Sequence, residues 1–197
     1  FARTDSLKSF LYFAWSDDLG DALAEDQRVM KTLETAAPKG LRWVGKGFPD
    51  ETHGSIPLLA HIEALRRLYA GYRFHNDLLE KGFAFAEKHF QGVSKEVGYT
   101  IPVPEDVVNT FGYEALSAGN IQEAMVLFQR NVDQNPHSAN AYDGLADAYE
   151  KAGKWDEAVA SSKKAVALAK KYNDPNSGYF IRHLDKVVEK RKRQSEK

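Results

Sequence analysis

The feature that most constrains this chain is a pattern of small and apolar residues that occurs twice, 34 residues apart. The corresponding pairs are Phe111-Gly112 with Leu145-Ala146, Gly119 with Gly153, and Ala124 with Ala158. A period of about 34 residues predicts helix–turn–helix repeats. Such units bury their apolar faces only by stacking on one another. We therefore expect an all-helical region that organises the second half of the chain.

Turn residues divide this region into helices at residues 105–118, 121–134, 138–151 and 155–171. A further helix is expected at 177–193, ending in the basic run Lys190–Arg193. Because a terminal repeat needs a polar outer face, we interpret this last helix as a cap with a solvated tail. Nucleic-acid binding by the tail is the weaker interpretation, since charge runs at a terminus are usually solvated.

The repeated positions resemble those of the tetratricopeptide repeat family. The second copy matches at Tyr142, Leu145, Ala146, Tyr149, Gly153, Ala158 and Ala165. Two positions depart from the family pattern: Ser162 replaces an aromatic residue, and Lys170 replaces a closing proline. The resemblance implies a mainly α fold, a right-handed superhelix of two repeats. Its concave groove would be lined by the first helix of each unit.

The resemblance also implies which side chains face that groove. They are Asn109, Tyr113, Asp143, Asp147 and Glu150. Some family members hold a peptide's terminal carboxylate with Lys, Arg and Asn, but this chain offers acids, which favour a basic or amide-rich ligand. The alternative is that two repeats form too short a groove to bind a partner and pack against the neighbouring domain instead.

The first half of the chain has the pattern of a parallel α/β sheet. Short apolar runs predict strands at residues 9–15 and 41–44, and helical periodicity predicts helices at 21–36 and 57–70. Two strands with two helices are too few to close such a sheet, because parallel strands need both faces covered. We therefore expect residues 1–72 to be a fragment of a larger domain. The start at Phe1 rather than Met also indicates that an upstream segment is missing.

A connecting region separates the two halves. A helix is expected at residues 74–92, followed by a linker to Pro104 that Pro102 and Pro104 bias towards extended structure. The expected domains are thus 1–72, 73–104 and 105–197.

Composition excludes several classes of function. The chain has 27 Lys and Arg against 28 Asp and Glu, so its net charge does not favour nucleic-acid binding. No apolar run approaches the roughly 20 residues of a membrane span, and there is no cysteine. The six histidines lack the His-x-x-x-His spacing, and no glycine-rich phosphate loop occurs. We expect no metal site and no cofactor, and the compartment cannot be read.

One loop carries residues suited to chemistry. His53 lies in the loop after the second expected strand, and Asp17 and Asp18 follow the first. In this order, acid before histidine, the segments Ser16-Asp17-Asp18, Leu41–Val44 and Glu51–Ser55 resemble the C-terminal part of the putative esterases. These are α/β hydrolases of the enterobactin-esterase type. Asn109–Tyr113, Asn131-Val132 and Ser138–Asp143 resemble the repeat tail that some members carry.

The resemblance implies roles for these residues. His53 would be the general base of a serine esterase, and Asp17 or Asp18 would orient it, with Asp18 preferred by position. Some relatives work with a Ser–His pair alone, and the two aspartates could instead form a strand-end turn or a helix cap. No Gly-x-Ser-x-Gly nucleophile elbow occurs, and Ser55 reads as a loop residue. We expect the chain to be inactive without that serine.

Two functional hypotheses follow. The first is the C-terminal portion of a serine esterase-like hydrolase with a tetratricopeptide appendage. The second is a non-enzymatic protein-interaction module whose α/β part is a degenerate scaffold. In either case, exposed strand edges at 11–15 and 41–44 favour self-association.

Overall fold

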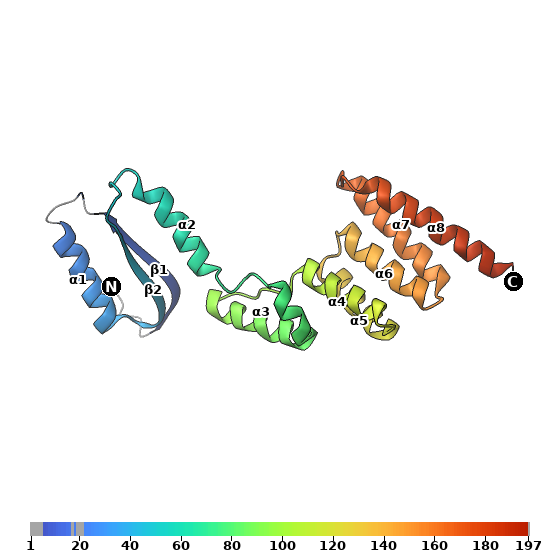
Figure 1. The fold of residues 1–197 in the computed structure, drawn as a ribbon, viewed down its shortest axis with the longest axis horizontal. Helices are drawn as coiled ribbons and strands as arrows, with labels where there is room; N and C mark the ends of the chain where they lie inside the picture. The colour runs from blue at the N-terminus through green and yellow to red at the C-terminus, as the bar shows by residue number, and fades with distance from the viewer. Residues whose placement is uncertain (1–5, 17, 19–21, 197) are drawn as a thin grey trace. The chain divides into compact units, whose positions relative to one another are not determined.

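The computed structural model describes residues 6–16, 18 and 22–196, and these are mainly helical (Figure 1). The chain forms two compact units. The first comprises the residues up to Phe74 together with His89–Ile101, and the second comprises His75–Lys88 together with Pro102–Lys197. The expected connecting region, 73–104, is thus shared between the units. Each unit is described by itself below.

The first unit contains a small parallel sheet. Strand β1 (Ser6–Ser16) pairs with β2 (Lys39–Phe48), and helix α1 (Ala22–Ala36) connects them. Parallel pairing requires such a crossover, so the expected strand–helix–strand order is confirmed. Among the described residues the sheet has two strands. Since many α/β folds contain this unit, the sheet does not identify a hydrolase.

Strand β2 is longer than expected. The sequence predicts its end at Val44, but it continues to Phe48 through two glycines. A Cβ on Gly45 would lie 2.2 Å from the Met30 sulfur, and one on Gly47 would lie 2.9 Å from Nε1 of Trp15. The glycines therefore admit side chains from α1 and β1. That requirement comes from contacts distant in sequence, so local propensity misses it.

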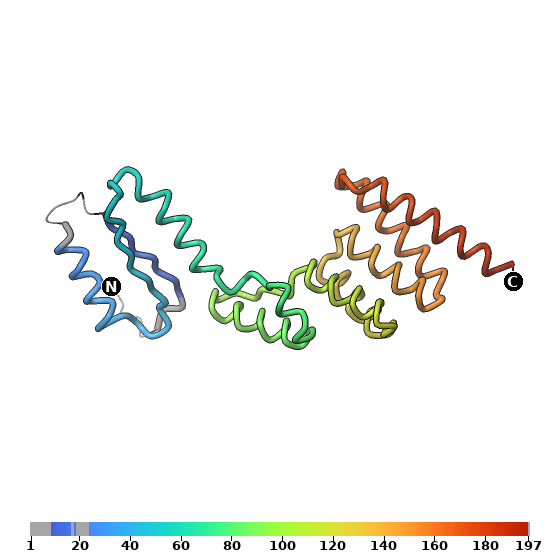
Figure 2. Tube along the Cα trace, viewed as in Figure 1, coloured from blue at the N-terminus to red at the C-terminus, as the bar shows by residue number. Residues whose placement is uncertain are grey.

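Helices cover both faces of the sheet. Met30 of α1 lies on the face that carries Trp15. The other face carries Lys46, whose Nζ lies 3.5 Å from Oε1 of Glu63 in helix α2 (Ile56–Leu68). Side chains alternate along a strand, so α1 and α2 lie on opposite faces, as the trace of this unit also shows (Figure 2).

The prediction of a helix at residues 74–92 is wrong in its bounds. A 3₁₀ helix, η2 (Asn76–Lys81), comes first, and α3 (Phe83–Val97) begins after Gly82. Gly82 has φ of 81°, a left-handed conformation that interrupts a helix. Helix α3 then runs through Gly92 into the expected linker and ends before Gly98, whose φ is 87°. The apolar spacing hides the break, because Leu78 and Leu79 before Gly82 and the phenylalanines after it recur at helical spacing.

The second unit matches the expected helices to within two residues. It contains α4 (Glu105–Ser117), α5 (Ile121–Gln134), α6 (Ala139–Lys151), α7 (Trp155–Lys171) and α8 (Ser177–Ser195). Gly119 and Gly153 take φ of 79° and 71° in the turns after α4 and α6. Asn120 N–H donates to the Ala115 carbonyl, and Lys154 N–H donates to that of Tyr149. The two turns therefore form the same type of glycine C-cap at positions 34 residues apart.

Close helix approach explains the small residues of the repeat. Phe128 of α5 is fully buried. A Cβ added to Gly112 would lie 2.6 Å from its ring, and one added to Gly144 would lie 2.5 Å from it. The two glycines, on α4 and α6, therefore form the walls that hold this ring.

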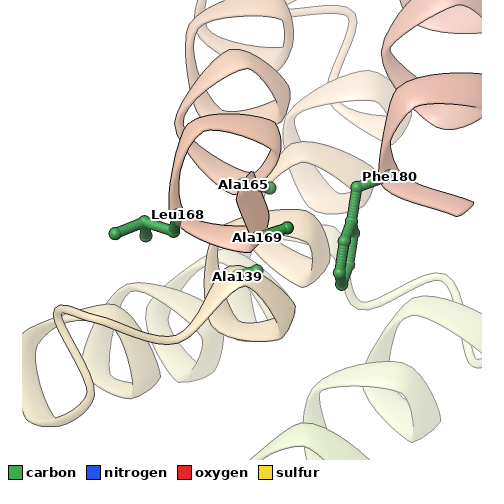
Figure 3. Close-up of a cluster of buried hydrophobic side chains, with 5 residues drawn as sticks. All are labelled: Ala139, Ala165, Leu168, Ala169 and Phe180. Carbon is green, nitrogen blue, oxygen red and sulfur yellow. The ribbon is translucent and has the colours of Figure 1, made fainter. Parts of the chain in front are cut away.

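Helix α8 belongs to the core of the second unit. Figure 3 shows the buried cluster that joins α8 to α6 and α7. Its members are Ala139, Ala165, Leu168, Ala169 and Phe180. A second cluster places Val187 against Ala158 and Val159. The expected cap is thus packed along much of its length. None of the described helices has the length and apolar character that crossing a bilayer requires.

Candidate functional site

Helix α6 contacts both α4 and α8, and side chains of all three helices meet on one face of the second unit. We call it the α4/α6/α8 face and define it by Asn109, Tyr113, Asp143, Asp147, Tyr179 and His183. Tyr113 and Asp147 are 34 residues apart, as are Asn109 and Asp143. The repeat therefore brings equivalent positions of α4 and α6 together, and α8 adds its own residues beside them.

His183 of α8 bridges two carboxylates of α6. Its Nδ1 lies 2.6 Å from Oδ1 of Asp143, and its Nε2 lies 3.2 Å from Oδ1 of Asp147. An imidazole that donates from both nitrogens is protonated. These hydrogen bonds, to Asp143 first and then Asp147, raise the pKa of His183 to about 10. The ion pair thus fastens α8 to α6.

Two tyrosines flank this ion pair. Tyr113 Oη donates to Oδ2 of Asp147 at 2.9 Å, and its ring stands edge-on to Phe128 at 5.0 Å. Burial, and then the charge of Asp147, raises the pKa of Tyr113 well above its usual range. The Tyr179 ring lies 6.2 Å from that of His183. Burial and the nearby Asp143 also raise the pKa of Tyr179.

The structure places each expected groove residue. Asp143 is 1% exposed, so its carboxylate meets His183 rather than solvent. Asp147 remains partly exposed, with 29% of its side chain accessible. Glu150 pairs with Lys190 of α8. Asn109 Oδ1 is buried with no hydrogen-bond partner.

Sequence reasoning missed Tyr179 and His183. Both lie on α8, which reads from its sequence as a cap rather than as a helix that contributes to the face. His183 lies 40 residues from Asp143, which is outside the 34-residue period. The available signal is a histidine and a tyrosine on the polar side of a helix that follows two repeats.

The second candidate site lies in the first unit. Asp18 Oδ2 accepts the backbone N–H of His53 at 2.9 Å, and Asp18 Oδ1 accepts the Ser16 hydroxyl at 2.5 Å. These bonds, from Ser16 first, lower the pKa of Asp18. The structure thus joins the strand end to the His53 loop through Asp18. Asp17 lies outside the described residues.

Within that loop, Ser55 has structural partners. Its hydroxyl donates to Oε2 of Glu51 at 2.6 Å and accepts the Thr52 N–H at 2.9 Å. This arrangement stabilises the turn that precedes α2. Among the described residues, no group of three or more His, Asp or Glu side chains is arranged to hold a metal ion.

The first unit also exposes apolar side chains along α2. They are Leu58, Leu59, Ile62, Leu65 and Tyr69. Leu58 is 70% exposed. Positions 58, 62, 65 and 69 recur at helical spacing, so these side chains form one apolar stripe along the helix. We call it the α2 stripe.

Comparisons with known proteins bear on the second unit, called the helical unit from here on, while the first is called the α/β unit. A family model described as tetratricopeptide repeat matches residues 115–173, from the end of α4 through α7. No curated protein matches the chain. The helical unit is therefore tetratricopeptide-like, and such repeats support a protein-interaction role.

A crystal structure of an uncharacterised protein from Capnocytophaga ochracea DSM 7271 is similar to this chain, with a TM-score of 0.50 and 14% identity. The similarity covers 92% of this chain and 53% of that protein. This chain thus spans about half the length of that protein. At such low identity the likeness concerns the fold alone. Neither match names a hydrolase.

Proposed function

We propose that this chain is a protein-interaction module that binds a polypeptide partner on the α4/α6/α8 face. One observation carries the proposal. Helix α6, which lies within the residues matched by the tetratricopeptide model, contacts α4 and α8 there, and the face presents tyrosine and carboxylate side chains, with Tyr179 49% exposed. Tyrosine is enriched at binding surfaces, because its ring is apolar while its hydroxyl tolerates water.

The face is also held in a fixed geometry, which favours binding. The hydrogen bond from Tyr113 to Asp147 fixes both side chains, and the His183 ion pair fixes α8 beside α6. Beneath them, Phe128 fills the space between Gly112 and Gly144. A preorganised surface loses less conformational entropy when a partner binds.

The test is selection of random peptides displayed on phage against the intact chain, followed by affinity measurement on the purified peptides. We expect selected peptides to bind the α4/α6/α8 face. Tyr179→Ala should weaken them about tenfold, a typical effect for an aromatic contact residue. Tyr172→Ala is the matched control, because Tyr172 is equally exposed in the same unit but lies on the C-cap of α7.

Circular dichroism would confirm that both variants fold. The proposal fails if no peptide is selected, or if the selected peptides bind Tyr179→Ala and the unaltered chain equally.

Ester hydrolysis is the second candidate function, because a hydrogen bond from the His53 backbone N–H to Asp18 brings the His53 loop to the end of β1. In the esterase hypothesis, His53 is the general base and Asp17 or Asp18 orients it, whereas Asp18 here accepts the backbone N–H of His53 rather than a ring nitrogen. The role requires that a serine from an elbow reach the exposed His53 ring. This sequence has no Gly-x-Ser-x-Gly, so another segment would have to supply it.

An assay with short p-nitrophenyl esters separates the candidates. The sequence as given should show no turnover above buffer. A gene product that contains it together with an elbow serine should hydrolyse the esters, and His53→Ala should reduce kcat by about a hundredfold or more. His61→Ala is the control, because His61 lies on α2 with its Nδ1 2.5 Å from the Pro57 carbonyl oxygen. Full activity in His53→Ala would eliminate the catalytic role.

A further inference from the structure

We propose that the α4/α6/α8 face binds a lysine or arginine side chain of its polypeptide partner. The cation would lie against the carboxylate of Asp147, on the face that also carries Tyr113 and Tyr179. This inference rests on the proposed function and adds to it the chemistry of the partner.

The charges on the face do not balance. Asp143 and Asp147 carry two negative charges, and His183, which bridges them, carries one positive charge. Both nitrogens of His183 are already engaged, so it offers no further donor to a ligand. The cluster is left with one net negative charge, which favours a cation and disfavours an acidic side chain.

The two carboxylates differ in access. Asp143 is almost fully buried and serves the contact with α8. Asp147 is 29% exposed, and its oxygens each have one partner, Tyr113 Oη and His183 Nε2. A carboxylate oxygen has two acceptor sites, so Asp147 retains capacity for an ammonium or guanidinium donor.

Tyrosines of two different helices lie at the ion pair that Asp147 forms with His183. The Tyr113 hydroxyl is used by Asp147, so this residue offers a ligand its ring. Tyr179 is half-exposed on α8, and its ring lies 6.2 Å from that of His183, whose Nε2 is 3.2 Å from Oδ1 of Asp147. A cation beside tyrosine rings gains about 0.5–1 kcal/mol at an exposed site. Rings and carboxylate together therefore favour a cation over an apolar side chain of equal length.

The probes are four capped tripeptides, acetyl-Gly-Xaa-Gly-amide, in which Xaa is Lys, Arg, norleucine or Glu. Each is titrated at millimolar concentration into the ¹⁵N-labelled chain and followed by NMR. We expect the Lys and Arg probes to shift the amide signals of Tyr113, Asp147, Tyr179 and His183. Norleucine has the length of lysine without its charge, so it should bind at least about fivefold more weakly.

Variants locate the contribution of each group. Asp147→Asn should weaken the Lys probe about tenfold, because it removes the charge that the cation meets. Tyr179→Leu should weaken it two- to fivefold through loss of the cation–π contact, and it leaves the ion pair of His183 intact. Tyr172→Leu should leave binding unchanged. Tyr179→Leu keeps the inference testable if Asp147→Asn fails to fold.

Equal binding of norleucine and lysine, or Lys-probe shifts that fall outside the face, would overturn the inference. The proposed function survives if phage-selected peptides still require Tyr179 but their affinity does not depend on a lysine or arginine. If selected peptides ignore the face altogether, the proposed function fails as well.

Discussion

The two units of this protein differ in where their side chains find partners. In the helical unit, the apolar ring of Phe128 and the charged Asp143 are both buried and both have partners within the unit. In the α/β unit, α2 exposes a stripe that includes Leu58 and Leu65, over a sheet with two described strands. Phe128 and Asp143 of the helical unit are thus buried against partners of their own unit, whereas the α/β unit exposes apolar surface of the kind that other elements cover.

The difference follows from how each architecture forms contacts. A helical repeat buries its apolar face against the unit next to it in sequence, so two repeats and α8 suffice for a core. A parallel sheet needs several strands and helices on both faces. Stability in the first unit should therefore depend little on the α2 stripe, and stability in the second should depend strongly on single buried residues.

Phe128→Ala should have the largest effect. Its ring fills the space between Gly112 and Gly144, and removal of such a buried ring costs about 3–5 kcal/mol. Urea denaturation followed by far-UV circular dichroism measures the loss in the helical unit. Val126→Ala, on the exposed side of the same helix, should change the free energy of unfolding by about 0.5 kcal/mol or less. Similar values for the two variants would show that the core is not where the structure places it.

Asp143→Asn should have the next largest effect. The change keeps the shape of the side chain but removes the buried charge that His183 meets at 2.6 Å. Loss of a hydrogen bond between charged groups costs about 1.5–3 kcal/mol. The same denaturation measurement applies, with Asp185→Asn on the exposed surface of α8 as the control. An unchanged free energy of unfolding would mean that α8 is held by its apolar contacts alone.

The ion pair also predicts a pH dependence. Because the pKa of His183 is raised to about 10 in the folded chain, its stabilising contribution is full below its unfolded pKa of about 6.5. The contribution falls as the pH rises from there towards 10, with a slope on the order of 1 kcal/mol per pH unit. Unfolding free energies from pH 6.5 to 9.5 would show this decline, and His183→Gln would lack it. Parallel curves for the two proteins would contradict the assignment.

Substitutions in the α2 stripe should have the smallest effect on stability. Leu58→Ser with Leu65→Ser should change the free energy of unfolding by about 0.5 kcal/mol per site or less, since both side chains are exposed.

We also predict that the unaltered chain self-associates through its exposed strands and the α2 stripe. Analytical ultracentrifugation should then show less association in the double variant. A chain that is monomeric at every concentration would contradict that prediction.

The sequence predicted the helical unit well, because its information is local and repeated. Gly119 and Gly153 mark turns that need a left-handed residue, and they fix the helix ends. The break at Gly82 was missed, since the helical spacing of apolar residues continues across it. The extension of β2 through Gly45 and Gly47 was missed because Trp15 and Met30 cause it from a distance.

The candidate site could be predicted only in part. Tyr113 and Asp147 share a repeat position, so the period places them together. Nothing in the period places His183 against Asp143, because α8 follows a longer helix and falls outside the 34-residue register. Asp143 and Asp147 were expected to bind a cation of the partner, but the imidazolium of His183 already pairs with both. The net charge of the face could therefore not be predicted from the sequence.

Hydrogen exchange, measured by mass spectrometry with and without a phage-selected peptide, tests the central claim most directly. If the α4/α6/α8 face binds the partner, peptide binding should slow exchange in segments containing Tyr113, Asp147 and Tyr179. Exchange in α2 and around His53 should remain unchanged. Slower exchange confined to the α/β unit would contradict the claim and place the binding surface on the first unit.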